Sequence, residues 1–489
     1  MSVLENRDAR MPSERIAMPE DKHYKLRMKH QMALNADPRK SGVINAVIGY
    51  AGLVVVAPLL ILAITYQGLP ALLELLQAPR GSFWFNLVNG ILGPVLAFLF
   101  VAVVALINIL MLRKYLGKVQ NRFGPLHNGP SGSLQTVFDA LKLVAKEDHT
   151  PKMVEETIFT LAPALVFVSA FLLMAVIPFA PGWVFGNTDS GAIFIIAAGT
   201  LGSYGVLLAG WSMNNKFGLL GGLRAAAQLV SYEVPLSIAL LSVCVYSGSM
   251  NLTSIVEAQA ANGFWNVFPL IIPFVVYLIA GLAEIKMTPF DLPEAESELV
   301  AGFNTEYGGM RFGFFFVAEF AELYLLPAVL AIFFLGGWHG FSIPTFGIDL
   351  LQNWAGNKDA AALELILRAN IPEKATASGF WQTAFGPGGL LLNLQYAFWF
   401  LLKGAAGVYF YMWIRATLPR FRDDQLMELC WKFLIPLSLI GLFLAAVFRL
   451  VPVLGQIFGV IIGAIFGLWV LWIIFRPLLP KARVSGRNA

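Results

Sequence analysis

Ten long apolar runs alternate with polar stretches along the sequence. They lie at residues 43–66, 86–112, 158–180, 191–213, 229–249, 266–284, 312–336, 391–415, 433–450 and 453–476. Each is long enough to cross the hydrocarbon core of a bilayer as an α-helix. Only Val451 and Pro452 separate the ninth run from the tenth, which predicts a tight helical hairpin or one broken element. The pattern predicts an all-α polytopic membrane protein with about ten transmembrane helices.

The polar segment 113–157 contains a shorter helical pattern. Its apolar residues recur at helical spacing and form one face: Leu134, Val137, Phe138, Leu141 and Val144. Asp139, Lys142 and Lys146 fall on another face. This pattern predicts an amphipathic helix in the membrane interface. It is either a surface anchor or one wall of a site for an amphipathic ligand that enters from the lipid.

The basic residues give the orientation of the spans. With the N-terminus inside, the inner segments hold 28 of the 34 lysines and arginines, the outer segments hold five, and Lys403 lies within a span. Because Lys and Arg are enriched in cytoplasmic loops, both termini are predicted to be cytoplasmic. The inner loops are also rich in unusual residues, so we look for function on the inner face.

The composition agrees with this interpretation. Hydrophobic residues make up 57% of the chain and charged residues 13%, against about 25% in a typical soluble domain. The mean hydropathy is +0.69. These values exclude a soluble globular enzyme and a disordered protein, and the continuous apolar runs exclude a porin-like β-barrel. The net charge of +4 says little about nucleic acid.

The residues that hold redox centres are scarce. Two cysteines, Cys244 and Cys430, are too few for a four-cysteine metal or iron–sulfur site. Four of the five histidines lie in polar segments, and His339 follows an apolar run, so no pair is placed to hold a haem inside the membrane. We therefore expect no redox centre in this chain itself.

The inner loop at 284–306 is unusually acidic. It holds six carboxylates and one lysine: Glu284, Lys286, Asp291, Glu294, Glu296, Glu298 and Glu306. Helix capping accounts for one or two of these acids. Carboxylates clustered at a low-dielectric boundary cannot all stay ionised, which suits a proton relay or an electrostatic switch. The alternative is a solvated acidic loop.

Charged residues also lie within the spans. Glu233 is near the start of the fifth span, Glu319 and Glu322 lie inside the seventh, and Lys403 lies inside the eighth. An ionisable group in a span is costly and is a functional candidate by default. The alternative is a buried ion pair that fixes helix packing.

Several of these segments share motifs with a known family. They include QNRFGP at 120–125, DALKL at 139–143, LRAAAQ at 223–228, SYEVP at 231–235, PFDLPEAESELVAGF at 289–303 and RATLPRFR at 415–422. On these motifs, the sequence resembles the H subunit of bacterial NADH-quinone oxidoreductase, the counterpart of mitochondrial complex I subunit 1. The motifs are long, ungapped and specific, and are spread over about 86–450.

The resemblance implies an eight-helix family core at 86–450. Outside it lie a cytoplasmic tail (1–42), an extra span with an outer loop (43–85), and an extra span with a basic tail (451–489). It also implies two sets of site residues. The quinone-binding set is Arg113, Asp139, Lys142, Phe290 and Asp291. The proton-channel and coupling set is Glu233, Glu284, Glu294, Glu296, Glu298, Glu306 and Glu319.

The resemblance further implies a translocase in the bacterial inner membrane, which couples quinone reduction to proton translocation. Quinone is the substrate, and FMN and iron–sulfur clusters belong to partner subunits. The expected partners are the peripheral quinone-site and iron–sulfur subunits, small membrane subunits, antiporter-like subunits and membrane lipid, but not nucleic acid.

Two departures and two alternatives accompany this interpretation. The family usually has Glu where this chain has Leu112, and often has Arg where it has Met287, beside Lys286. Either change could alter quinone affinity or type. The first alternative is the equivalent membrane subunit of a hydrogenase or formate-hydrogenlyase complex. The second is a stand-alone transporter, which predicts inverted repeats that the sequence does not show.

Overall fold

The fold is known from a computed structural model. It describes residues 56–68, 83–126, 128, 132–293, 296–340, 390–455, 457–459 and 461–462. These residues form helices and no β-strand. Seven of the helices are long and apolar enough to cross a membrane, which confirms an all-α polytopic membrane protein. The N-terminal tail, most of the first and tenth predicted spans and the outer loop beyond 340 lie outside the described residues.

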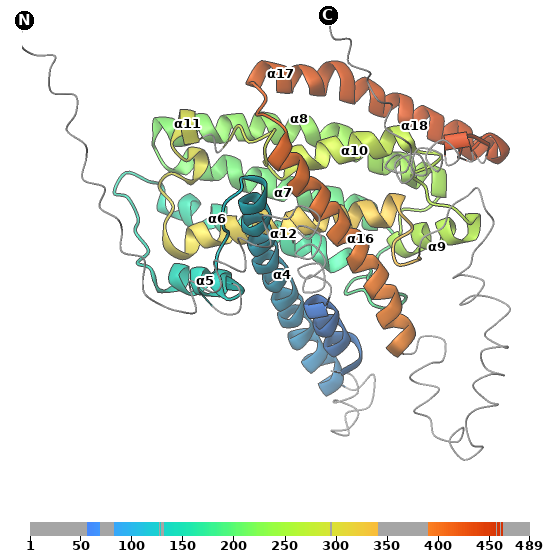
Figure 1. The fold of residues 1–489 in the computed structure, drawn as a ribbon, viewed down its shortest axis with the longest axis horizontal. Coiled ribbons are helices and arrows are strands. Elements are labelled where there is room, and N and C mark those ends of the chain that lie inside the picture. The colour runs from blue at the N-terminus through green and yellow to red at the C-terminus, as the bar shows by residue number, and fades with distance from the viewer. Residues whose placement is uncertain are drawn as a thin grey trace, which may run out of the picture.

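The helices follow the predicted apolar runs. The long ones are α4 (Phe83–Val119), α6 (Glu156–Val176), α7 (Gly191–Ser212), α8 (Lys216–Ser247), α12 (Gly309–Phe334) and α16 (Leu390–Thr417). A seventh long span, Asp423–Leu450, is one continuous helix made of α17 (Asp423–Glu428), the π-helical η4 (Leu429–Leu434) and α18 (Ile435–Leu450). Shorter apolar helices cover Val56–Tyr66 and α10 (Ile271–Glu284). Figure 1 shows α17 and α18 on one line along an edge of the bundle.

Three helices extend beyond their apolar runs at the end of the bundle that carries the predicted inner loops. α4 continues to Val119, α8 begins at Lys216, and the last span begins at Asp423. Asn215 accounts for the start of α8, since its side chain accepts a hydrogen bond from Phe217 N at 3.1 Å and caps the first turn. Segment 214–228, predicted as a loop between spans, is therefore mostly helical.

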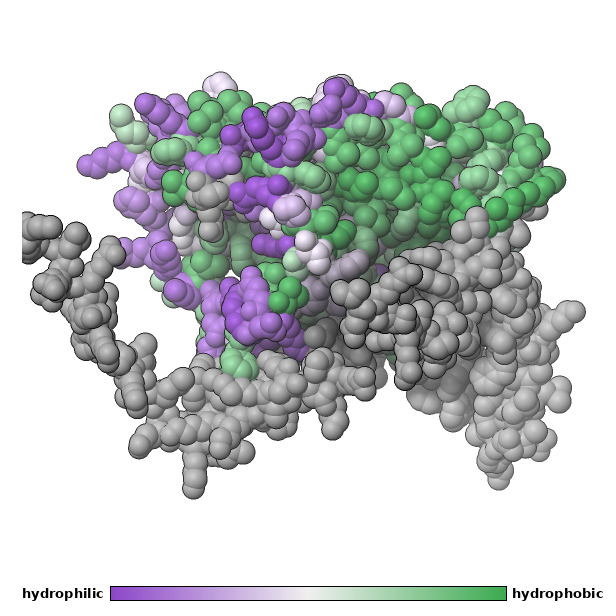
Figure 2. All heavy atoms as spheres, turned by 45° about the horizontal axis from the view of Figure 1, so that its top comes forward, coloured by the Kyte–Doolittle hydropathy of each residue, from purple (hydrophilic) through white to green (hydrophobic). Residues whose placement is uncertain are grey.

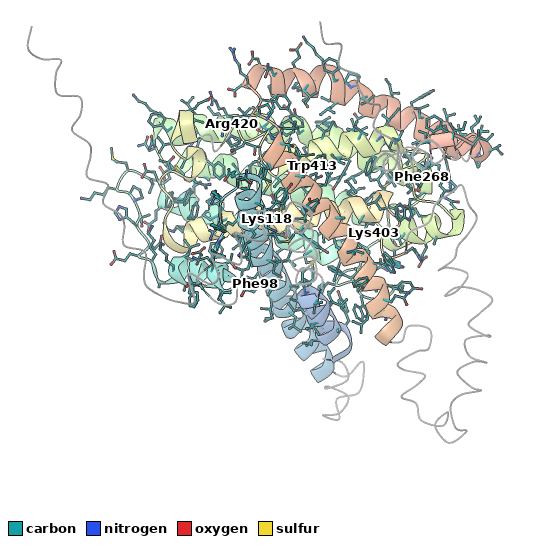
Figure 3. All side chains as sticks on the ribbon, in the orientation of Figure 1. Phe98, Lys118, Phe268, Lys403, Trp413 and Arg420 are labelled. Atoms are coloured by element: carbon teal, nitrogen blue, oxygen red, sulfur yellow. The ribbon has the colours of Figure 1, made fainter. Side chains whose placement is uncertain are left out.

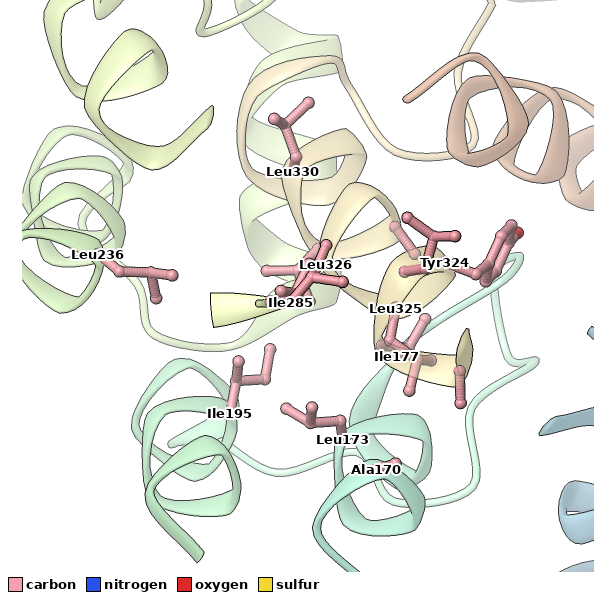
Figure 4. Packing of buried hydrophobic residues seen from close by; sticks show 14 of the residues in the cluster. Ala170, Leu173, Ile177, Ile195, Leu236, Ile285, Tyr324, Leu325, Leu326 and Leu330 are labelled. Atoms are coloured by element: carbon pink, nitrogen blue, oxygen red, sulfur yellow. The ribbon is translucent and has the colours of Figure 1, made fainter. Parts of the chain in front are cut away.

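α12 lies at the centre of the bundle. Its buried side chains surround the helix over most of its length, and it contacts α4, α6 and α16. α7 and α8 approach closely at two glycines: a Cβ added to Gly210 would lie 2.6 Å from Gly222 Cα. In Figure 4, Leu173, Ile195 and Leu236 come from α6, α7 and α8 toward Leu326 of α12. This convergence of four helices positions the site described below.

The predicted interfacial helix is present as α5 (Gln135–Ala145). The apolar residues expected on one face, Leu134, Val137, Phe138, Leu141 and Val144, are all exposed. An exposed apolar face on a short surface helix is typical of a helix that lies in the plane of the membrane.

The surface has two distinct parts. Figure 2 shows hydrophilic residues gathered over the end of the molecule that carries α5 and the short helix α11 (Glu296–Leu299). On the side of α18 the surface is apolar, and Trp431, Phe433 and Phe443 are exposed there. The polar end holds the predicted inner loops.

Candidate functional site

A small cavity brings three carboxylates together inside the helix bundle. Its volume is about 30 Å³, enough for a water molecule. The carboxylates are Glu233 from α8, Glu284 from the end of α10 and Glu322 from α12. The remaining wall is mostly apolar: Leu173, Ile195, Ile196, Gly199, Leu236, Ser237, Tyr277 and Leu326. Acids that are far apart in the sequence thus meet at one polar site in an apolar surround.

Local backbone features place Glu233 and Glu284. Pro235 in α8 has no N–H to donate to Ser231 O, and the Cys430 thiol donates to this carbonyl at 3.0 Å instead. Glu284 is the last residue of α10. Two residues later, buried Lys286 has a left-handed backbone (φ 59°) that turns the chain into the acidic loop.

The three carboxyls have few hydrogen-bond partners. Thr200 of α7 is hydrogen bonded to Glu233 Oε1. Glu284 Oε2 is buried with no hydrogen-bond partner among the described residues, and Glu322 is buried. Lys286 is near enough to Glu284 and Glu322 to interact with both electrostatically. Because an unpaired carboxylate is costly away from water, this arrangement favours a neutral, protonated form for part of the cluster.

Both acids of α12 are functional candidates as charges within a span, and the resemblance assigns Glu319 to the channel. Glu322, one turn further on, lines the cavity. Glu319 is half-buried and is not among the residues that line the cavity. The only sequence signal for Glu322 was an acid within a span.

The first part of the acidic loop is held against the neighbouring helices. Phe290 is buried, with its ring centroid 5.5 Å from those of Tyr232 and Phe421. Gln228 Nε2 donates to the carbonyl of Phe290 at 2.8 Å. Asp291 forms an ion pair with Arg420 at 3.1 Å. Phe290 and Asp291 therefore pack against residues of this chain.

The later loop acids form surface contacts. Glu298 is exposed and accepts a hydrogen bond from Arg224 Nη1 at 2.7 Å, while Arg224 Nε is 3.2 Å from Asp423. The Arg224 guanidinium holds the pKa of Glu298 below its ordinary value. Glu306 accepts from Asn215 Nδ2 at 2.9 Å. Glu294 and the side chain of Glu296 lie outside the described residues.

Two of the predicted quinone-site residues meet beside α5. Arg113 near the C-terminal end of α4 forms an ion pair with Asp139 of α5. Gln135 Nε2 also donates to Asp139, at 3.0 Å. Lys142 is exposed on the same helix. The structure thus brings Arg113 and Asp139 together, while Phe290 and Asp291 make the separate contacts described above.

Lys403 is the fourth charged residue predicted within a span. Its ammonium donates to the carbonyls of Leu335 (2.5 Å), Gly337 (2.9 Å) and His339, and it lies 4.8 Å from the centre of the Trp265 ring. Figure 3 shows Lys403 on α16, away from Arg420. A cation beside the last carbonyls of a helix stabilises that end. Lys403 therefore fixes the chain at the end of α12.

Burial and the nearby Lys403 ammonium lower the pKa of His339 to about 4. The imidazole is therefore neutral at physiological pH. The charge of this group resides on the Lys403 ammonium, and backbone carbonyls satisfy it.

Comparisons with known proteins agree with this architecture. The family model described as NADH dehydrogenase matches residues 92–446. The H subunit of NADH-quinone oxidoreductase from Geobacillus kaustophilus is 41% identical over 369 residues, which are 75% of this chain and 94% of the relative. Its namesake in Bacteroides thetaiotaomicron is 38% identical over 377 residues (76% and 94%). Its namesake in Bacillus thuringiensis is 39% identical over 378 residues (77% and 98%).

These similarities cover most of this chain and nearly all of each relative. The matched region contains the helices that line the cavity, the α5 helix and the acidic loop. The chain therefore belongs to the NADH dehydrogenase family, together with the H subunits of NADH-quinone oxidoreductases, and is a membrane subunit of an oxidoreductase complex.

Proposed function

We propose that this chain is the membrane subunit of a proton-pumping NADH:quinone oxidoreductase that couples quinone reduction to proton translocation. The observation that carries this proposal is the cavity that Glu233, Glu284 and Glu322 share among apolar helices. Carboxyls in such a place exchange protons with water and with one another, and the charge of one affects the others.

The quinone part of the proposal rests on α4 and α5. A quinone has a polar head and a long apolar tail, so it approaches along the membrane interface. α5 presents an exposed apolar face there, and Arg113, Asp139 and Lys142 supply polar groups beside it. In the proposal these residues frame the entrance, and peripheral subunits with FMN and iron–sulfur clusters deliver the electrons.

Reduction of the quinone takes up two electrons and two protons. The quinone stays neutral overall, but the groups that supply its protons become more negative, and in the proposal this change of charge on the inner side acts on the loop that begins at Glu284. Lys286, two residues later, interacts electrostatically with Glu284 and Glu322. The loop thereby connects the quinone side to the cavity, and protons move among its carboxyls in response. Glu294, Glu296, Glu298, Glu306 and Glu319 extend this path in the proposal.

The surroundings of the chain follow from the same proposal. The peripheral subunits bind at the polar inner end, and small membrane subunits and antiporter-like subunits bind within the membrane. The membrane is the bacterial inner membrane, with both chain ends on the cytoplasmic side, as the basic residues predict.

The test is to purify a tagged copy of the chain with its partners in mild detergent and measure NADH-driven quinone reduction. We expect activity that a quinone-site inhibitor blocks, and proton uptake when the complex is placed in vesicles. Hydrogen evolution in place of quinone reduction would contradict the proposal and favour the hydrogenase branch.

A further inference from the structure

Thr200 contacts Glu233 through a hydroxyl that has two acceptors within reach. Thr200 Oγ1 lies 3.0 Å from Ile196 O, one turn back in α7, and is also hydrogen bonded to Glu233 Oε1. A hydroxyl carries one proton but accepts as well as donates. The two contacts therefore cannot both be donated by Thr200.

The protonation state of Glu233 decides how the proton is used. If Glu233 is a neutral acid, its O–H donates to Thr200, and Thr200 donates to Ile196 O. If Glu233 is ionised, Thr200 turns its proton to the carboxylate. Ile196 O then keeps the backbone bond of the helix. Glu233 is hydrogen bonded in both states.

Ser237 lines the same cavity, but among the described residues the hydrogen bond to the Glu233 carboxyl comes from Thr200. Tyr277 of α10 donates its hydroxyl proton to Leu326 O at 3.0 Å. Glu284 and Glu322 face the same cavity, and Lys286 interacts with those two carboxyls. Thr200 provides the hydrogen bond to Glu233 that the structure shows.

We propose that Thr200 is a positioning residue for proton transfer, because its hydroxyl pairs with Glu233 as an acid and as a carboxylate. This inference rests on the proposed function. In the transfer step, the proton of Glu233 passes to water in the cavity, and the Thr200 hydroxyl rotates from Ile196 O to the carboxylate. Thr200 keeps its own proton throughout, so the step moves one proton, from the Glu233 carboxyl oxygen to water, and otherwise exchanges only hydrogen bonds.

The test uses two substitutions in the assembled complex. Thr200→Val keeps the shape of the side chain but removes the hydroxyl, and Thr200→Ser keeps the hydroxyl. A hydrogen bond to a charged group contributes enough for roughly a tenfold effect. We expect Thr200→Val to lower NADH-driven proton pumping in vesicles about tenfold, and Thr200→Ser to stay near wild type.

Thr65→Val is the matched control. Thr65 makes the same bond to the carbonyl one turn back, Ile61 O at 2.8 Å, and is buried, whereas Thr200 is half-buried. The Thr65→Val complex should pump protons as well as wild type does. Infrared difference spectra of oxidised and reduced complex provide a direct readout: the carboxylic-acid C=O band that Glu233→Gln removes should shift in Thr200→Val and remain in place in Thr65→Val.

Two results would overturn the inference about Thr200. One is normal pumping and an unshifted carboxyl band in Thr200→Val. The other is an equal loss in Thr200→Ser and Thr200→Val, which would indicate packing instead of the hydroxyl. Glu233→Gln distinguishes a failure of the proposed function from a failure of the inference about Thr200. If that variant pumps normally, the proposed function fails at Glu233. If it is impaired while Thr200→Val is normal, only the role of Thr200 fails.

Discussion

The buried ionisable groups of this membrane bundle differ in how many hydrogen-bond partners surround them. At the end of α12, the Lys403 ammonium has three carbonyl acceptors and an aromatic ring beside it. In the cavity, Glu233 and the carbonyl of Ile196 compete for the single hydroxyl proton of Thr200. Glu284 Oε2 has no hydrogen-bond partner among the described residues. The Lys403 ammonium is thus saturated with hydrogen bonds, and the carboxyls of the cavity are not.

This difference separates a structural charge from a functional one. Loss of a proton from a saturated ion removes one of its hydrogen bonds and turns a lone pair toward a carbonyl oxygen, so these contacts favour the charged form. An unsaturated carboxyl cluster beside a water-sized space has nearly equivalent arrangements of its protons. Burial alone does not tell the two apart, and the number of hydrogen bonds does.

The largest expected effect concerns the saturated group. Lys403→Met should destabilise the complex by about 3 kcal/mol, because buried carbonyls lose their donor. The activity of each complex that does assemble should stay close to wild type. Thermal melting of the purified complex, with activity normalised to assembled enzyme, tests both points.

Lys432→Met is the control for a lysine in the last span. Its ammonium is exposed and lies 2.6 Å from Glu428, so its loss should change the stability by less than about 1 kcal/mol. A Lys403→Met complex that melts normally but no longer pumps would break the comparison, since Lys403 would then be a functional charge.

The next effect concerns the unsaturated group. Glu322→Gln keeps the size of the side chain but removes an exchangeable carboxyl proton. We expect about a tenfold loss of proton pumping with little change in the melting temperature. Glu257→Gln is the matched control, because Glu257 is exposed on α9 (Leu252–Asn262), away from the cavity. A Glu322→Gln complex that is unstable but fully active would show that Glu322, like Lys403, has a structural role.

Much of the fold follows from the apolar runs. A helix is the simplest way for one apolar segment to satisfy its backbone in lipid, and the runs at 158–180 and 191–213 match α6 and α7 closely. The residues at which the helices begin and end were harder to predict. Hydropathy falls near Arg224, but α8 begins at Lys216 because Asn215 caps it and glycines allow close packing.

The candidate site was predicted less completely. Glu233 was singled out as an acid within a span and Glu284 as part of the acidic loop, and the resemblance placed Arg113 and Asp139 in one quinone-binding set. The choice between Glu319 and Glu322 depends on which side of α12 faces the cavity. α12 is buried on nearly all sides, so its sequence has no polar face that reveals this direction. Thr200 is an ordinary threonine in an apolar run until α8 is placed beside it.

The smallest expected effect concerns the exposed ion pair of Arg224 and Glu298, which tests the comparison at the protein surface. Arg224 holds the pKa of Glu298 below its ordinary value of 4.5. A carboxyl with a lowered pKa in the folded state stabilises that state above its ordinary pKa, and this contribution disappears as the pH falls through the lowered value. The melting temperature of wild type should therefore exceed that of Glu298→Gln slightly at pH 7, and the two should converge below about pH 4. Equal melting at both pH values would mean that solvent screens this ion pair completely. The proposed path includes Glu298, so a loss of pumping in Glu298→Gln, with the small stability change as expected, would place an acid with a satisfied surface contact on the proton path. The number of hydrogen bonds would then separate the two kinds of charge only among buried groups.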